Sequence, residues 1–324
     1  MSEDSATPSV AVVGSLNLDT LLTVPYFAEP GSTVAATSWE SRFGGKGANQ
    51  AIAASRQGAT VSLIGCVGSD ASGRAYREYL EKQNINTLGL HPLDGVQTGR
   101  AYVCVDGKGQ NTIVTASGAN GYLSAQMVLR QHKDIEGADA VMCQLEVPLE
   151  ATIAALQLAT ELGRITVLNP SPMNSHFPWG QVPVDFLIVN EREATALLGY
   201  QVESTGEAAT IRSQMADLGV GTLIITRGAD HTFLFSGKQA LKVPPPAVDV
   251  VDTTGAGDAF AGAFAVHYAL TRDILKSLKA ANIAGALTCT RIGAQDAIPM
   301  RDEVEGYGKA PIERTAGSDE LVGA

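Results

Sequence analysis

The chain has 324 residues, 45% of them hydrophobic, and a formal net charge of −11. This composition supports a large core, and the length allows either two domains or one large α/β unit. The acidic charge argues against nucleic acid and anionic membranes as partners.

Targeting and membrane features indicate a cytoplasmic protein. No apolar run reaches the ~18 residues needed to span a membrane. Residues 1–8 lack the basic and apolar regions of a secretory signal. The four cysteines, Cys66, Cys104, Cys143 and Cys289, are far apart and form no C-x-x-C pair. We therefore expect buried, reduced thiols and neither a zinc site nor a disulfide framework.

Short apolar runs and helical repeats alternate along most of the chain. Apolar runs predict strands at residues 9–14, 60–68, 138–145, 165–169, 185–190, 222–226 and 232–235. Helical spacing predicts helices at residues 51–57, 71–82, 149–162, 191–198, 205–218, 259–270 and 275–289. This alternation indicates an α/β fold with a mostly parallel central sheet and helices on both faces.

Two segments interrupt the alternation. Residues 20–43 contain Thr, Val and aromatic residues separated by Pro and Gly turns, a pattern typical of short strands. Residues 98–115 contain two further strands around the turn Asp-Gly-Lys-Gly at 106–109. We expect both segments to form a small separate sheet that acts as a lid.

The lid sheet also predicts an assembly. A small sheet has open edges, and Val103, Val105 and Ile113 would expose an apolar face. A second copy of the chain can cover that face, so we expect a homodimer formed through the lid.

The polar, glycine-rich loop 252–258 precedes the predicted helix 259–270. Thr253 or Thr254 can cap this helix, which places the loop at a helix N-terminus, where free N–H groups attract anions. Asp258 would repel a phosphate there, but it can take a proton from a hydroxyl that attacks the phosphate. The loop alone also fits a structural turn in which Asp258 stabilises the first helical turn.

Polar side chains gather at the C-terminal ends of the predicted strands, where α/β sheets bind ligands. Asn17 and Asp19 follow the first strand and point the same way in an extended chain, as would two groups that hold neighbouring sugar hydroxyls. An Asx turn explains this pair equally well. Further candidates at this edge are Glu146, Asn190, Glu193, Thr226, Arg227 and Gly228. Their clustering predicts a ligand site along one edge of the sheet.

Residues 44–50, Gly-Gly-Lys-Gly-Ala-Asn-Gln, form a second glycine-rich segment. The segment lacks the spacing of a Walker A loop. Its glycines allow a compact ligand to approach the following helix, and Asn49 can hydrogen-bond a hydroxyl. A solvated charge is an alternative explanation of Lys46.

Two long signatures stand in the chain in a fixed order. They are residues 44–70, GGKGANQAIAASRQGATVSLIGCVGSD, and residues 252–260, DTTGAGDAF, with N-E-R-E at 190–193 between them. With these motifs the chain resembles the ribokinase/PfkB carbohydrate kinase family from about residue 9 to residue 299. The resemblance implies a three-layer α/β/α fold with a small β lid, and ATP-dependent phosphorylation of the 5-hydroxyl of D-ribose. It further implies one domain over residues 1–324. The C-terminal stretch is polar and contains glycine, which predicts a flexible tail at residues 308–324.

The resemblance implies a role for each matching position. Asp258 would activate the hydroxyl, and the amides of Gly255, Ala256 and Gly257 would form the anion hole. The sugar-binding positions are Asn17, Asp19, Gly45, Lys46, Gly47, Asn49, Glu146 and Asp258. The nucleotide positions are Asn190, Thr226, Arg227, Gly228, Gly257 and Asn282, with Glu193 associated with Mg²⁺. The positions Asp252, Thr254, Thr288, Arg291 and Gly293 match a site for a monovalent cation, K⁺.

The chain departs from the family pattern at three positions. His231 replaces a usual glycine in the nucleotide loop, Arg100 stands in the lid hairpin where a small or apolar residue is common, and Ala297 replaces a serine near the cation site. Two alternatives to a ribose kinase remain: a kinase for deoxyribose, another pentose or a nucleoside, and a non-catalytic sugar-binding regulator on the same fold. The presence of both Asp258 and its loop favours a kinase.

Overall fold

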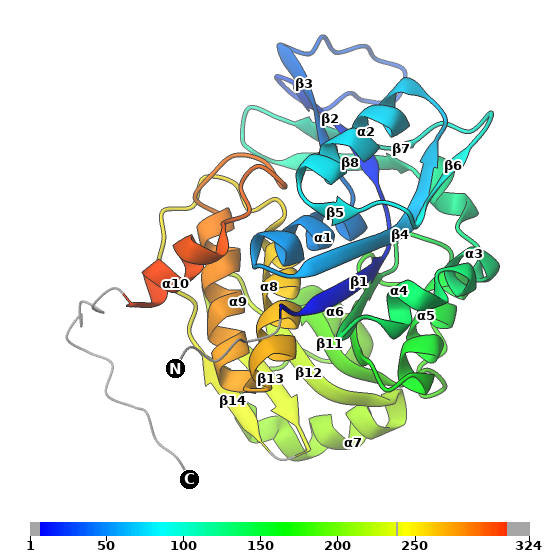
Figure 1. The fold of residues 1–324 in the computed structure, drawn as a ribbon. Helices are drawn as coiled ribbons and strands as arrows, with labels where there is room; N and C mark the ends of the chain where they lie inside the picture. The colour runs from blue at the N-terminus through cyan, green and yellow to red at the C-terminus, as the bar shows by residue number, and fades with distance from the viewer. Residues whose placement is uncertain (1–6, 238, 310–324) are drawn as a thin grey trace.

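A large central sheet and a smaller second sheet organise the molecule (Figure 1). The computed structural model describes residues 7–237 and 239–309. In spatial order, the central sheet contains β14 (Ala240–Val243), β13 (Thr232–Ser236), β12 (Val220–Thr226), β11 (Val184–Asn190), β10 (Ile165–Asn169), β9 (Ala140–Gln144), β1 (Ser9–Val13), β4 (Thr60–Gly68) and β5 (Ile85–Asn86), with β6 (Leu90–Leu93) also paired to β4. The strands from β12 to β5 pair in parallel, whereas β13 and β14 are antiparallel. The predicted mostly parallel sheet is thus confirmed.

Helices cover both faces of the central sheet (Figure 1). One face carries α1 (Lys46–Arg56), α2 (Ala71–Lys82), α8 (Ala256–Thr271), α9 (Ile274–Thr288) and α10 (Arg301–Lys309). The other face carries η1 (Gly118–Tyr122), α3 (Ala125–Arg130), α4 (His132–Glu136), α5 (Leu149–Glu161), α6 (Glu191–Leu198), η2 (Thr205–Glu207) and α7 (Ala208–Leu218).

Strand β1 shows how one segment supports two cores. Val10 and Val12 pack into the core with α1 and α8, while Ala11 and Val13 pack into the core with α5. Successive side chains of a strand point to opposite faces, so a strand covered on both sides is apolar throughout. The sheet therefore holds its C-terminal strand ends in fixed positions between two packed layers.

The second sheet, here called the lid sheet, lies at the top of Figure 1. Its strand order is β3 (Ser38–Gly44), β2 (Asn17–Thr23), β7 (Gly99–Val105) and β8 (Asn111–Ala116). Asn17 pairs with Gly44 on one side and with Gly99 on the other. The lid sheet therefore begins beside the glycine-rich start of α1. Of the apolar face predicted from the sequence, Ile113 is exposed and Val103 and Val105 are half-buried.

Helix α1 begins five residues before its predicted start at residue 51. Gly45 precedes it with a φ of 91°, and Lys46 is its first residue. The polar residues of the first turns hide the apolar period that predicts a helix. Most of these residues are buried, so their polarity reflects contacts inside the molecule and not a solvated loop.

The sequence pattern misses several short elements, namely β5, β6, β14, η1, α3, α4 and α10. It also merges η2 and α7 into one helix. Gly308 and Lys309, the first two residues of the predicted tail, belong to α10. The rest of the predicted tail, residues 310–324, lies outside the described residues.

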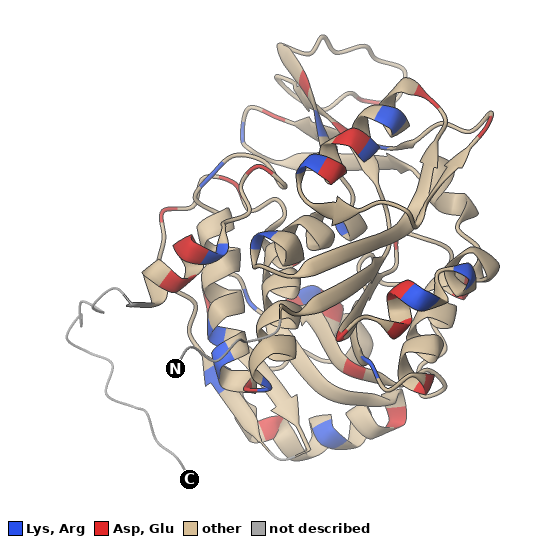
Figure 2. Ribbon diagram, in the orientation of Figure 1, with Lys and Arg blue, Asp and Glu red and all other residues tan. Residues whose placement is uncertain are grey.

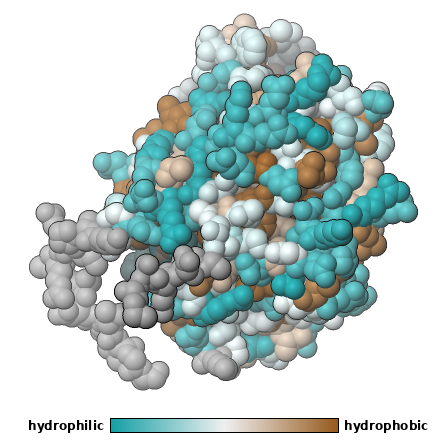
Figure 3. All heavy atoms as spheres, viewed as in Figure 1, coloured by the Kyte–Doolittle hydropathy of each residue, from teal (hydrophilic) through white to brown (hydrophobic). Residues whose placement is uncertain are grey.

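Charged residues lie mainly on the helices and loops, and the strands β1 and β4 carry none (Figure 2). On the face in Figure 3, apolar residues occur in separate places among hydrophilic ones. No helix in the described ranges is long and apolar enough to cross a membrane. All four cysteines are free; Cys66 and Cys143 are buried as predicted, whereas Cys104 and Cys289 are partly exposed.

Candidate active site

The loop 252–255 ends at the start of α8, which carries the predicted base. Gly255 has a φ of 78° and precedes Ala256, the first residue of the helix. No side chain caps α8, so the prediction that Thr253 or Thr254 caps it is wrong. Asp258 stands in the first turn and is only 5% exposed. A helix N-terminus without a side-chain cap leaves N–H groups available to an anion.

Thr254 instead belongs to a small network around Asp252. The Asp252 Oδ1 accepts hydrogen bonds from Thr254 N at 2.9 Å and Thr254 Oγ1 at 2.6 Å, and Oδ2 accepts one from Gly293 N at 2.9 Å. Burial alone would raise the pKa of Asp252, but these hydrogen bonds outweigh it and the pKa is lowered. Asp252 therefore remains a carboxylate that joins the loop to the segment at Gly293.

Two cavities meet at this loop. A polar cavity of about 410 Å³ is lined by Lys46, Asn169, Ser171, Ile188, Val189, Asn190, Glu193, Thr226, Thr253, Gly255, Gly257 and Asp258. An apolar cavity of about 370 Å³ is lined by Thr226, Gly228, Ala229, Thr232, Pro245, Pro246, Ala247, Val248, Val250, Thr253, Ala256, Gly257, Phe260, Asn282, Gly285, Ala286 and Cys289. Thr226, Thr253 and Gly257 line both. The start of α8 therefore separates a polar space from an apolar one.

The polar cavity brings together residues from distant parts of the sequence. Asn190 and Glu193 form a capping box at the start of α6, with Asn190 Oδ1 accepting from Glu193 N and Glu193 Oε2 accepting from Asn190 N, both at 2.9 Å. Burial tends to lower the pKa of Lys46, but the carboxylates of Asp258, Glu146 and Glu193 raise it overall. Lys46 is thus a cation held among acidic groups, not a solvated charge.

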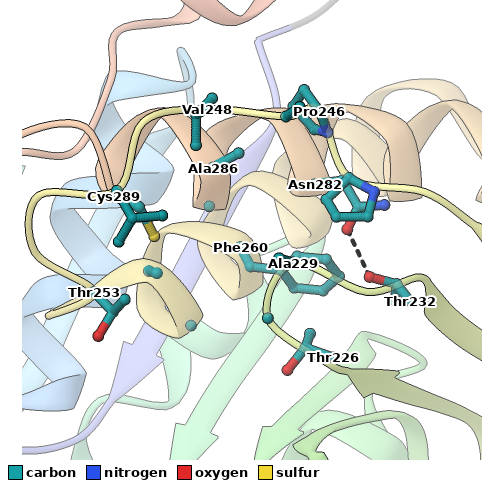
Figure 4. A pocket seen from close by; sticks show the side chains of 17 residues that line it. Thr226, Ala229, Thr232, Pro246, Val248, Thr253, Phe260, Asn282, Ala286 and Cys289 are labelled. Carbon is teal, nitrogen blue, oxygen red and sulfur yellow. Dashed lines mark hydrogen bonds between the residues drawn. The ribbon is translucent and has the colours of Figure 1, made fainter. Parts of the chain in front are cut away.

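The apolar cavity has few free polar side-chain atoms (Figure 4). Asn282 Oδ1 accepts a hydrogen bond from Thr232 Oγ1 at 2.7 Å, and Asn282 Nδ2 donates to Val243 O at 3.3 Å. Thr226 Oγ1 donates to Val189 O at 3.3 Å. The rest of the lining is mainly apolar side chains and glycine, which suits a flat, apolar ligand.

A third group of predicted residues surrounds the start of α1. Glu146 Oε2 accepts from Ser15 Oγ at 2.5 Å and from Lys46 N at 3.1 Å. Asp19 Oδ1 is buried and has no hydrogen-bond partner within the described residues. Burial, then the charges of Glu146 and Asp258, raise the pKa of Asp19 to about 7. These groups lie close enough for their charges to interact, and Asp19 Oδ1 is available to accept a hydrogen bond from a ligand.

The sequence profile of the pfkB family of carbohydrate kinases matches residues 7–301 of this chain. The chain belongs to this kinase family. It is 35% identical to the ribokinase of Haemophilus influenzae over 295 residues, which are 91% of this chain and 96% of that protein. It is 30% identical to the deoxyribokinase of Salmonella typhi over 299 residues, 92% of this chain and 98% of that protein.

Solved structures of carbohydrate kinases have the same fold. The structure of Arabidopsis thaliana ribokinase complexed with ribose and ATP matches with a TM-score of 0.87 and 28% sequence identity, over 94% of this chain and 99% of that one. The ribokinase of Thermotoga maritima matches with a TM-score of 0.81 and 32% identity, over 93% and 99%. The predicted three-layer kinase fold is confirmed.

In this kinase, two amide side chains hold the Asp258 carboxylate. Asn49 Nδ2 donates to Oδ2 at 2.9 Å, and Gln50 Nε2 donates to Oδ1 at 3.0 Å. The sequence predicts Asn49 as a sugar-binding residue and gives Gln50 no role. Gln50 stands within the first family signature, but its type and spacing carry no signal for a contact 208 positions away.

Two other side chains complete the surroundings of the site and were not predicted. Gln295 Nε2 donates to Asn49 Oδ1 at 2.9 Å and to Tyr76 Oη at 2.7 Å. Asn120 Nδ2 donates to Asn17 Oδ1 at 2.8 Å, so the Asn17 oxygen is already engaged. Amide side chains are common on protein surfaces, and only their burial in the fold distinguishes these two.

The glycines at the start of α1 are required by close packing. A Cβ on Gly47 would lie 2.5 Å from the carbonyl carbon of Gly14, and a Cβ on Gly45 would lie 2.7 Å from the Asn17 nitrogen. Such contacts with backbone atoms cannot be relieved by rotating a side chain. Gly45 and Gly47 therefore bring the backbone of α1 against the end of β1.

The residues predicted to hold a monovalent cation come from three segments near the loop. The Val251 and Asp252 N–H groups both donate to Cys289 O, at 2.8 and 3.2 Å. Thr288 Oγ1 donates to Ala284 O at 2.8 Å, and the Arg291 side chain pairs with Glu303. The side chains of Thr288 and Arg291 thus have protein partners, so any ligands from this segment would be backbone carbonyls. Of these, Thr288 O already accepts a hydrogen bond from Arg291 N at 3.3 Å.

The remaining predicted positions lie outside both cavity linings. Arg227 forms ion pairs with Glu191 at 3.0 Å and Asp230 at 3.1 Å, beside the apolar cavity. His231 contacts Asp230 and does not have a positive φ, so its backbone needs no glycine. Arg100 is half-buried in the lid sheet. Burial tends to raise the pKa of Asp70, but hydrogen bonds from Thr98 and Gly73, and then the charge of Arg100, lower it overall.

Proposed function

We propose that this carbohydrate kinase transfers the terminal phosphoryl group of ATP to the 5-hydroxyl of D-ribose, giving ribose 5-phosphate and ADP. The position of Asp258 carries the proposal, since it lines the polar cavity at the start of α8, next to Gly257, which lines both cavities. A base beside anion-binding amides suits phosphoryl transfer to an alcohol. The ribokinases among the relatives support the choice of sugar.

Each part of the site then has a task. Asp258 takes the proton of the 5-hydroxyl as it attacks, and the N–H groups of Gly255 and Gly257 stabilise the charge that develops on the phosphoryl group. The Ala256 N–H donates to Thr253 O at 3.2 Å and would have to turn from that carbonyl to join them. Lys46, a cation in the polar cavity, offsets part of that charge. No covalent intermediate is needed, because the two substrates are held on either side of one loop.

The sugar lies among Asn17, Asp19, Asn49 and Glu146, with the backbone of Gly45, Lys46 and Gly47 close by. Carboxylates and amides bind neighbouring hydroxyls well because they offer several acceptor and donor atoms. Asp19 Oδ1, buried without a partner in the described structure, is the atom that most needs a hydroxyl. A sugar hydroxyl at this atom would remove the cost of burying it unpaired.

The nucleotide lies in the apolar cavity, with its base near Asn282 and its phosphates toward Thr226, Gly228 and Gly257. Mg²⁺ fits the polar cavity, where Glu193 Oε1 lies free of the capping box and Asn190 lies nearby. A carboxylate and water are the ligands that Mg²⁺ prefers. When bound, the ion would neutralise phosphate charge.

A monovalent cation, K⁺, fits the surroundings of Asp252. Its carboxylate already accepts three hydrogen bonds, so the ligands would be chiefly backbone carbonyls of the segments that contain Thr254, Thr288, Arg291 and Gly293. Hard oxygen ligands suit an alkali cation. When bound, the cation would hold the loop 252–255 in place beside the anion hole.

A second candidate function is phosphorylation of deoxyribose, which the 30% identity to a deoxyribokinase favours. The two functions differ in whether the sugar 2-hydroxyl is needed. A coupled assay of ADP release over pentoses, 2-deoxyribose, hexoses and nucleosides separates them. The highest kcat/KM with D-ribose is the expected result, and turnover of nucleosides alone would overturn both proposals.

The lid sheet is proposed to form a homodimer of a cytoplasmic enzyme. Exposed apolar residues of the lid sheet, Trp39, Tyr102, Ile113 and Val114, support the first part. Light scattering at assay concentrations should give twice the mass of the chain. A monomer mass there would contradict the dimer.

A further inference from the structure

The base is held on its buried side by a network of uncharged amides. Each carboxylate oxygen of Asp258 accepts one hydrogen bond from α1, Oδ2 from Asn49 and Oδ1 from Gln50. Asn49 is 6% exposed, whereas Gln50 is 0% exposed. Gln50 therefore cannot touch a substrate, although it touches the group that would react with one.

Gln50 is itself locked by its neighbours. Its Oε1 accepts a hydrogen bond from Gln144 Nε2 at 2.6 Å, and its Nε2 also donates to Asn169 Oδ1 at 3.2 Å. Gln144 is 0% exposed and comes from β9. With oxygen and nitrogen both engaged, the Gln50 carboxamide has one orientation, in which the N–H group points at Asp258.

The chemical nature of this donor matters for a base. A cationic donor would stabilise the carboxylate strongly and weaken its affinity for a proton. A neutral amide fixes the direction of the carboxylate at a smaller loss of basicity. The carboxylate of Asp258 would otherwise be free to rotate about its terminal bond, which is a broad torsion.

We infer that Gln50 is a positioning residue for phosphoryl transfer, which through Gln144 holds the Asp258 carboxylate in the orientation that accepts the substrate proton. The inference rests on the proposed function. It assigns Gln50 an effect on the chemical step and none on substrate binding, because its side chain lines neither cavity.

The test is Gln50→Met, which keeps the length of the side chain and removes the donor. The expected result is a fall in kcat of about 10–100-fold, since a small misplacement of a reacting group costs up to about that much, with the KM values for sugar and nucleotide within about twofold of the parent. The acid limb of the kcat pH profile, measured at saturating sugar and nucleotide, should move to higher pH, because the carboxylate loses a hydrogen bond that favours its charged form.

Gln57→Met is the matched control. Gln57 lies at the end of the same helix, is 1% exposed and donates to Pro299 O at 3.1 Å, away from Asp258. An equal fall in kcat in this variant would mean that Gln50→Met acts through general damage to α1. That result would overturn the inference. So would a Gln50→Met enzyme with parental kcat and pH profile.

Gln144→Met provides an independent readout if Gln50→Met does not fold. It leaves Gln50 in place but removes its lock, so kcat should fall less and the acid limb should move in the same direction. A parental pH profile in Gln144→Met would contradict the inference. A parent enzyme with no sugar-dependent ADP release would instead refute the proposed function.

Discussion

The starts of α1 and α8 are built alike and used differently. Each helix follows a glycine with a positive φ, 91° at Gly45 and 78° at Gly255, and neither has a side-chain cap. At α1, Lys46 N donates to Glu146 Oε2, and two further N–H groups donate to Ser15. At α8, Ala256 N bonds back to Thr253 O while Gly257 lines both cavities.

The difference shows what makes a helix N-terminus into a site. At α1 the protein supplies the oxygens, so the start of the helix is closed and serves to position Glu146 and Lys46. At α8 the start opens into space, so a ligand can supply the oxygens. A glycine-rich sequence before a helix is compatible with both cases, and only the surrounding fold decides between them.

The substitution with the largest expected effect removes the base at the open start of α8. Asp258→Asn should lower kcat by about 10²–10⁴-fold, the usual contribution of a positioned base, while sugar and ATP still bind. Turnover assays and calorimetric titration of each ligand check this. A variant with near-parental kcat would show that the open start of α8 works without Asp258 as base.

A pair of glycine substitutions compares the two starts directly. Gly45→Ala and Gly255→Ala each force a side chain into the left-handed region, which costs about 1–2 kcal/mol. A Cβ at Gly45 would lie 2.7 Å from a backbone atom, whereas one at Gly255 would lie 3.0 Å from Ala294, so Gly45→Ala should lose more stability. Urea unfolding measures stability, and Gly255→Ala should show the larger fall in kcat relative to its stability loss. The reverse order in both readouts would contradict this assignment of roles.

The pH dependence of sugar binding tests the role of Asp19, which lies beside the closed start of α1. In the free enzyme the pKa of Asp19 is raised to about 7, so below that pH its carboxyl is largely protonated. Hydroxyls that donate to the carboxylate lower its pKa on binding, so binding releases a proton and sugar affinity should weaken as pH falls below about 7. Titration calorimetry in buffers of different ionisation enthalpy counts the protons.

Asp19→Asn is the control for this measurement. It should bind sugar more weakly and with little dependence on pH over the same range. Parental affinity that is constant between about pH 5.5 and 7.5 would mean that Asp19 does not accept sugar hydroxyls.

The smallest expected effect concerns the loop that supports the open start. Potassium should raise kcat/KM relative to sodium and caesium at fixed ionic strength, and only modestly, because Ala297 offers no hydroxyl ligand. Asp252→Ala should remove the difference between the salts. Equal rates in all three salts, with full activity in Asp252→Ala, would eliminate the cation site.

The sequence predicts the helices and strands of this molecule better than its site. β4, α2, β10 and α6 have their predicted bounds because their apolar periods are clear and glycine or polar residues flank them. The start of α1 escapes prediction because its polar side chains face a buried site. Local rules assume that polar residues face water, so they fail where function places them inside.

The same reason explains which site residues the sequence misses. Asp258 and Asp19 belong to short motifs that suggest chemistry, and both are found beside the start of a helix. Gln50 and Gln295 act through partners that are remote in sequence, Asp258 and Asn49, and amide residues carry no motif of their own. Only the packed arrangement of α1, α8 and the segment at Gln295 reveals them.

The Asn282 carboxamide in the apolar cavity has a consequence for the choice of phosphoryl donor. Its oxygen accepts from Thr232, one of its two N–H groups donates to Val243, and Pro245 and Pro246 have no N–H group to offer a purine. Recognition of the base therefore rests largely on shape, and an apolar pocket separates similar ligands by only about 10–200-fold. Among the purine nucleotides of a cell, relative abundance would then decide which one the enzyme consumes.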